Sequence, residues 1–142
     1  MMNMLIFYKN IMLHSSRTIL ALNGIVMILM GLSFIIFAER MTVLMFPNII
    51  SNPEALEVAV TLRYLMGAGS IMVGIILYLA RISVKSGAQR LLLGSGIGFL
   101  LIFATALFVF LSDRANIPIP ALIVYPLLGL LSLFVSTRKY QE

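Results

Sequence analysis

The fold is decided by residues 91–111, LLLGSGIGFLLIFATALFVFL, a stretch without a single charged side chain. At about 1.5 Å per residue, a helix of this length covers roughly 30 Å, the thickness of the hydrocarbon core of a bilayer. Residues 18–37, 58–80 and 119–135 form three further apolar stretches. The sequence therefore predicts an all-α membrane protein, a four-transmembrane-helix bundle in one domain covering residues 1–142.

The composition supports a membrane protein and excludes several kinds of chemistry. Hydrophobic residues make up 61% of the chain and charged residues only 11%, whereas about 25% are charged in a soluble domain. The net charge of +5 contains no dense run of Lys or Arg, so we do not expect a nucleic-acid partner. The absence of Cys removes thiolate metal sites, and the single histidine, His14, has no second ligand. We predict no metal site and no evident cofactor, while a bound lipid, quinone or pigment stays open.

The distribution of basic residues predicts the orientation. Four crossings place both termini on one side of the membrane. Seven basic residues fall on that side and three on the other: Lys9, Arg17, Arg81, Lys85, Arg90, Arg138 and Lys139 against Arg40, Arg63 and Arg114. Because Lys and Arg in short loops stay in the cytoplasm, we predict cytoplasmic N and C termini. The expected location is the inner (cytoplasmic) membrane of a bacterium or archaeon.

The sequence also predicts the structure of the two connections on the side of the membrane opposite the termini. Asn52-Pro53-Glu54 combines a cap, a first-turn proline and a first-turn acid, so the second helix should begin there, outside the membrane. Before it, the apolar residues between Met41 and Phe46 should lie in the outer interface. The short connection around 112–116 should make the third and fourth helices antiparallel neighbours, and Pro126 should kink the fourth.

Arg63 is the main candidate for a functional residue, because ionisable groups inside membrane spans are costly. Residues 64–80 below it span about 25 Å, which places Arg63 near the outer boundary of the hydrocarbon. We prefer the interpretation that it is an interface anchor, reaching water or pairing with an acidic residue: Glu39, Glu57 or Asp113. The alternative is a site, with Tyr64, for the head group of a quinone, lipid or anionic substrate.

Other residues are expected to hold the helices together. Small residues spaced by four let helix backbones approach closely, which we predict for Gly94 with Gly98 and for Ser70 with Gly74. Asn23 is costly in lipid and should donate a hydrogen bond to another helix, for example to Ser95. Among the ten methionines, Met41 and Met45 are spaced by four, but without Cys or a nearby His we interpret them as flexible packing residues rather than copper ligands.

About three quarters of the chain resembles the DoxX-like group of small four-helix bacterial membrane proteins. The resemblance is carried by four segments: Gly31-Leu32-Ser33-Phe34, Met45-Phe46-Pro47, residues 62–69 (LRYLMGAG) and residues 74–77 (GIIL). It implies a compact four-helix bundle, and some members of the group are subunits associated with quinone-linked sulfur oxidation. Arg63 is the one residue that matches a position of the group, the arginine that opens the second span.

The leading functional hypothesis is a non-catalytic integral membrane subunit that packs against or stabilises a larger complex of membrane proteins, in contact with membrane lipids. The spans contain packing faces but almost no reactive groups, so we do not expect an enzyme. One alternative is a quinone- or lipid-binding redox accessory subunit built around Arg63 and Tyr64. Another is a small oligomeric transporter or channel, although no span contains the carboxylate that proton coupling requires.

Overall fold

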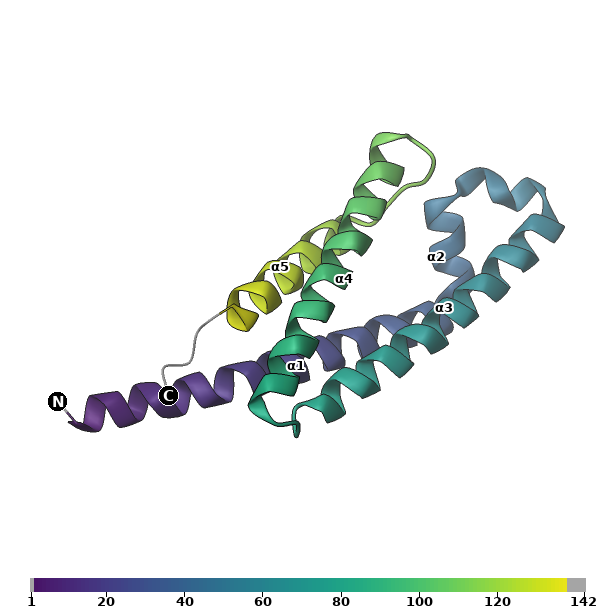
Figure 1. Cartoon of the computed structure of the whole chain (residues 1–142). Helices are drawn as coiled ribbons and strands as arrows, with labels where there is room; N and C mark the ends of the chain where they lie inside the picture. The colour runs from purple at the N-terminus through teal and green to yellow at the C-terminus, as the bar shows by residue number, and fades with distance from the viewer. Residues whose placement is uncertain (1, 138–142) are drawn as a thin grey trace.

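The computed structural model of the chain describes residues 2–137, and within them the side chains of residues 16–84 and 86–137. This part of the chain is helical and contains no strand (Figure 1): its elements are α1 (Met2–Ile36), α2 (Ala38–Met45), the 3-10 helix η1 (Pro47–Ser51), α3 (Pro53–Ala80), α4 (Lys85–Leu111) and α5 (Ile119–Ser136). Arg138 and Lys139, and the side chains of Lys9, His14 and Lys85, lie outside the described residues.

Four of the helices are long and apolar enough to cross a membrane: Ser16–Ile36, Pro53–Ala80, Ser86–Leu111 and Ile119–Ser136. The prediction of an all-α protein with four spans is therefore confirmed, and the orientation stays a prediction. The predicted start of the second span is also confirmed, because α3 begins at Pro53 and the side chain of Asn52 accepts a hydrogen bond from the Ala55 N–H (3.2 Å). Pro126 lies inside α5.

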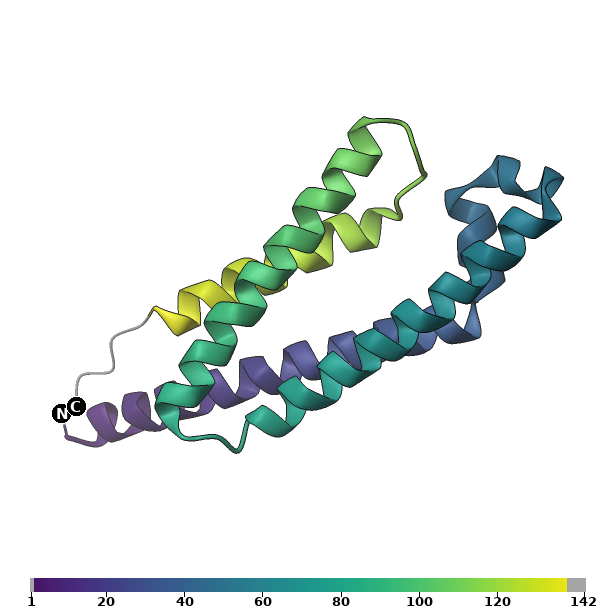
Figure 2. The same ribbon diagram turned by 45° about the vertical axis from the view of Figure 1, so that its right-hand side comes forward.

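The helices pack as two hairpins, α1 with α3 and α4 with α5 (Figure 2). Contacts within each hairpin are far more extensive than contacts between the hairpins, and α3 touches α4 only sparsely. The predicted pairing of the third and fourth spans is confirmed by the α4–α5 hairpin. We call the end of the molecule with α2, η1 and residues 112–118 the outer end, after the predicted orientation, and the opposite end the inner end.

Four glycines bring the backbones of α1 and α3 into direct contact. A Cβ atom added at Gly24 would lie 2.7 Å from the carbonyl oxygen of Gly74, and one added at Gly31 would lie 2.6 Å from that of Gly67. The two glycines of each helix are seven residues apart, so the pairs match between antiparallel helices. Between them Ser70 donates a hydrogen bond to the Met27 carbonyl (2.9 Å). Ser70 and Gly74 therefore hold two helices together as predicted.

The α4–α5 contact uses a different glycine of α4 from those that we predicted. A Cβ atom at Gly96 would lie 3.1 Å from the Gly129 carbonyl oxygen, whereas Cβ atoms at Gly94 and Gly98 would meet nothing within 4 Å. Gly94 and Gly98 therefore make no close contact within the described part of this chain, and their predicted role in helix packing stays a prediction. Two residues turn a helix by about 200°, so Gly96 lies on nearly the opposite face from its two neighbours.

A small core joins the two hairpins. Leu20 of α1 and Leu92 of α4 are fully buried in it, and the ring of Tyr125 lies 6.2 Å from that of Phe99. Asn23 makes polar contacts between the hairpins, which are described with the candidate sites below. Most other large apolar side chains of the spans point away from the chain, as expected where lipid or another protein provides the surroundings.

Candidate functional site

Arg63 is buried beneath the short helix α2. Its side chain is 9% exposed, although it belongs to a helix whose other faces are largely open. The helix α2 presents Ala38 and Thr42 toward the protein, with 2% and 1% exposure, while Glu39 and Arg40 on its other side are exposed. This amphipathic pattern folds α2 back against α3, and it covers Arg63 with side chains rather than water.

The partners of the Arg63 guanidinium among the described side chains are all neutral. Its Nε donates to the hydroxyl of Thr42 (3.1 Å), and that hydroxyl donates in turn to the Ala38 carbonyl (2.8 Å). Its Nη2 lies 3.1 Å from Sδ of Met45 and its Nη1 lies 4.0 Å from Sδ of Met41. The Cζ atom is 5.5 Å from the centre of the Phe34 ring, within range of a cation–π contact. These four side chains, with Arg63, form what we call the Arg63 cluster.

The predicted acidic partners of Arg63 are not in the cluster. Among the described side chains, Arg63 makes no ion pair, and Glu39, Glu57 and Asp113 are all exposed. The acceptors that the structure shows for Arg63 come from α2, and its role as an interface anchor stays a prediction. Tyr64, the second candidate, is 48% exposed and is not among the contacts of the guanidinium. The structure thus brings Arg63 together with residues that we had interpreted as packing or had not considered.

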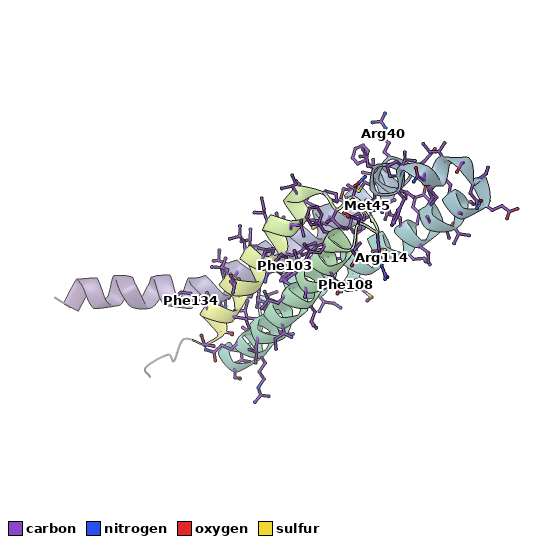
Figure 3. The ribbon with its side chains drawn as sticks, turned by 90° about the horizontal axis from the view of Figure 1, so that it is seen from above. Arg40, Met45, Phe103, Phe108, Arg114 and Phe134 are labelled. Atoms are coloured by element: carbon purple, nitrogen blue, oxygen red, sulfur yellow. The ribbon has the colours of Figure 1, made fainter. Side chains whose placement is uncertain are left out.

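A pocket of about 580 Å³ lies beside the Arg63 cluster at the outer end. One wall comes from residues 45–49 at the end of α2 and in η1, and the other from residues 113–116 between α4 and α5. The walls are linked by Asn116, whose N–H donates to the Met45 carbonyl (2.9 Å) and whose Nδ2 lies 3.5 Å from the Leu44 carbonyl. Figure 3 shows Met45 and Arg114 at this end, with Arg40 pointing away from the molecule. Met45 therefore belongs to both the pocket and the Arg63 cluster.

The second polar group lies deep between the hairpins. Asn23 is fully buried, and its Nδ2 donates to the hydroxyl of Ser132 (2.8 Å) and to that of Ser95 (3.4 Å). The predicted contact with Ser95 is confirmed, and Ser132 is an additional partner that the sequence did not single out. The Oδ1 atom of Asn23 has no hydrogen-bond partner among the described residues. This contact ties α1 to both α4 and α5, a structural role that fits the prediction.

A third feature is an apolar groove of about 310 Å³ between α3 and α4, which we call the α3–α4 groove. Val73 and Leu77 line its α3 side, and Gly94 and Gly98 line its α4 side. Arg90 stands at its inner end. The glycine pair that the sequence marked for helix packing thus faces an open groove rather than a helix of its own chain.

Comparison with protein-family models, with curated proteins and with solved structures finds no match to this chain. The resemblance to the DoxX-like group is therefore neither supported nor contradicted, and it stays a prediction.

Proposed function

We propose that the chain is a non-catalytic membrane subunit that holds a helix of a larger membrane protein in the α3–α4 groove. The observation that carries this proposal is the position of Gly94 and Gly98. Six of the other glycines of the spans lie at close helix contacts within the chain: Gly24, Gly31, Gly67, Gly74, Gly96 and Gly129. Among the described residues, nothing lies within 4 Å of the Cβ positions of Gly69, Gly94 or Gly98, and of these three only Gly94 and Gly98 form a pair with the spacing best suited to close helix contact.

The burial of the helices points to the same surface. The chain itself buries 17% of the apolar, membrane-spanning part of α3 and 17% of that of α4. In α1 and in α5 the corresponding share is 28% each. The two least covered helices are thus the two that border the groove. Glycine is among the poorest helix formers, so a pair of them in the middle of a helix is best explained by a contact that a larger side chain would block.

The chemistry of the spans supports a packing role over a catalytic one. Within the described residues, the polar groups that make contacts between elements of the spans include Asn23 with its two serine partners, Ser70, and the Arg63 cluster. The first two cross-link helices, and no group of three or more His, Asp or Glu side chains is found in this part of the chain.

The test is purification in a mild detergent with a double variant, Gly94→Leu with Gly98→Leu. Because neither position has a described neighbour within 4 Å, we expect the variant to fold and to melt no lower than the wild type while losing its partner. The matched control is Ala104→Leu, an exposed residue of α4 outside the groove, which adds a similar side chain and should keep the partner.

Quantitative mass spectrometry of the co-purifying proteins is the measurement. Support requires a protein that migrates with the wild type and with Ala104→Leu at one fixed stoichiometry and that is lost from the double variant. A wild-type chain that purifies alone, as a monomer or as a pure homo-oligomer, would refute the proposal. Retention of the partner by the double variant would show that the groove is not the contact surface.

A further inference from the structure

The charge of Arg63 has no counter-charge in the part of the chain that the structure describes. The side chain is 9% exposed, and its contacts are a hydroxyl, two thioethers and an aromatic ring. A buried cation is normally paired with a carboxylate or another anion, because removal from water is costly when nothing compensates the charge. Arg63 therefore keeps a positive charge available to a ligand.

The hydrogen-bonding capacity of the guanidinium is also only partly used. Arginine presents five N–H donors in a fixed planar fork, and in this chain three contacts are made. Two of the three acceptors are thioether sulfurs of Met41 and Met45, which accept hydrogen bonds weakly. The ligands that match a guanidinium best are phosphate and carboxylate groups, which accept parallel charge-assisted hydrogen bonds from its fork.

Met45 contacts the guanidinium and is also a residue of the outer pocket. Its Sδ is 3.1 Å from Nη2 of Arg63, and Met45 is among the residues that line the pocket of about 580 Å³. Methionine has an unbranched, flexible side chain, so the Met45 side chain can rotate away from Nη2 without movement of the backbone. The backbone of Met45 is fixed meanwhile by the hydrogen bond from Asn116.

The pocket offers further groups that suit an anion, and one that does not. Arg114 and the side-chain amide of Asn48 line it, whereas Asp113 brings one negative charge to the same wall. The depth favours phosphate over carboxylate. About 25 Å of apolar helix lies between Arg63 and the inner end of α3, so the pocket beyond Arg63 falls at the level of the lipid head groups.

We propose that Arg63 and the outer pocket form a binding site for a phosphate group, with Met45 as a cover that the ligand displaces. The phosphate is either the head group of an anionic lipid or a free phosphate ion from the outer side. This inference does not rest on the proposed subunit function, because the α3–α4 groove is lined by none of these residues.

The experiment uses the purified full-length chain in dodecyl maltoside, a detergent without a phosphate group. Phosphatidylglycerol is added in one arm and inorganic phosphate in the other, and binding is followed by native mass spectrometry and by the shift in melting temperature. We expect saturable binding in at least one arm. Phosphatidylglycerol retained in excess phosphate identifies a lipid site, and displacement of the lipid by phosphate identifies a site for the free ion.

Three variants test the roles of the residues. Arg63→Gln should weaken binding about tenfold or more, since it removes the charge and the fork but keeps a polar side chain. Met45→Ala should strengthen binding several-fold, because it removes the cover while leaving Arg63 in place. The matched control is Arg40→Gln, which removes an exposed arginine of α2 that points away from the pocket and should change binding little (Figure 3).

Equal affinities for Arg63→Gln and Arg40→Gln would overturn the proposal. A Met45→Ala variant that binds no more tightly than the wild type would overturn the role of Met45 as a cover. If Arg63→Gln does not fold, two other single variants still test the proposal. Met45→Ala must then bind phosphate more tightly than the wild type, and Arg114→Gln must bind it more weakly. Absence of binding in both arms would refute the site altogether.

Discussion

The backbone contact between α1 and α3 makes Gly24→Ala a destabilising substitution, although alanine favours a helix over glycine by about 1 kcal/mol. The added Cβ would lie 2.7 Å from the carbonyl oxygen of Gly74 and 2.7 Å from the backbone nitrogen of Tyr78. Ordinary contact begins at 3.4 Å, so the two helices must separate by about 0.7 Å, the difference between these distances. Neither neighbour is a side chain that can rotate away.

The size of the effect follows from that separation. A gap of about 0.5–1 Å loses a quarter to a half of the dispersion energy of each contact that it opens. Substitutions that overfill a packed interface cost about 1–3 kcal/mol. We therefore expect the free energy of unfolding of Gly24→Ala to be about 1–3 kcal/mol lower than that of a Gly→Ala variant at a helix position where the added Cβ meets no neighbour.

Gly94→Ala is that matched variant, because its Cβ would meet nothing within 4 Å. Both variants gain the same helix propensity, so the difference between them isolates the contact with α3. The free energy of unfolding can be measured for the purified chain in mixed micelles, with increasing SDS and circular dichroism as the signal. Equal stabilities for the two variants, or a more stable Gly24→Ala, would refute the reasoning that backbone contact fixes the α1–α3 hairpin.

Two further predictions concern the contact between the hairpins and the orientation. Asn23→Leu removes the donor to the buried hydroxyl of Ser132 and should lower the free energy of unfolding by about 0.6–1.7 kcal/mol in the same assay, the usual range for a hydrogen bond between membrane helices; an unchanged midpoint would show that the bond contributes nothing. Reporter fusions at the C terminus should read as cytoplasmic, and an external signal would reverse the predicted topology.

The sequence predicts the spans well because their signal is local. Freedom from charge over residues 91–111 is sufficient to identify α4, and Asn52 with Pro53 is sufficient to place the start of α3. The pairing of α4 with α5 was also predictable, since their short connection leaves no other arrangement. Each of these features depends on residues that are neighbours along the chain.

The packing faces were less predictable because they depend on where another helix lies. Gly94, Gly96 and Gly98 offer two nearly opposite faces of α4, and only the position of Gly129 selects Gly96. The spacing of seven between Gly24 and Gly31, repeated in α3, is visible in the sequence, but its meaning requires knowing that α1 pairs with α3.

The surroundings of Arg63 were missed for a similar reason. The sequence placed the arginine near the outer interface and suggested an acidic partner or water. It did not show that α2 folds back and supplies Thr42 and Met45 instead. The alternation of Ala38 and Thr42 with charged Glu39 and Arg40 was a readable sign of an amphipathic helix, though not of the surface that it covers.

The hydrogen bond between Asn23 and Ser132 joins residues separated by 109 positions, so the ribosome makes its two partners at different times. At about 5–20 residues per second, roughly 5–20 s pass between the synthesis of the two partners. Ser95 of α4, the other acceptor for the Asn23 amide, is synthesised earlier than Ser132. The bond that ties α1 to α5 can therefore form only after the last helix has been made.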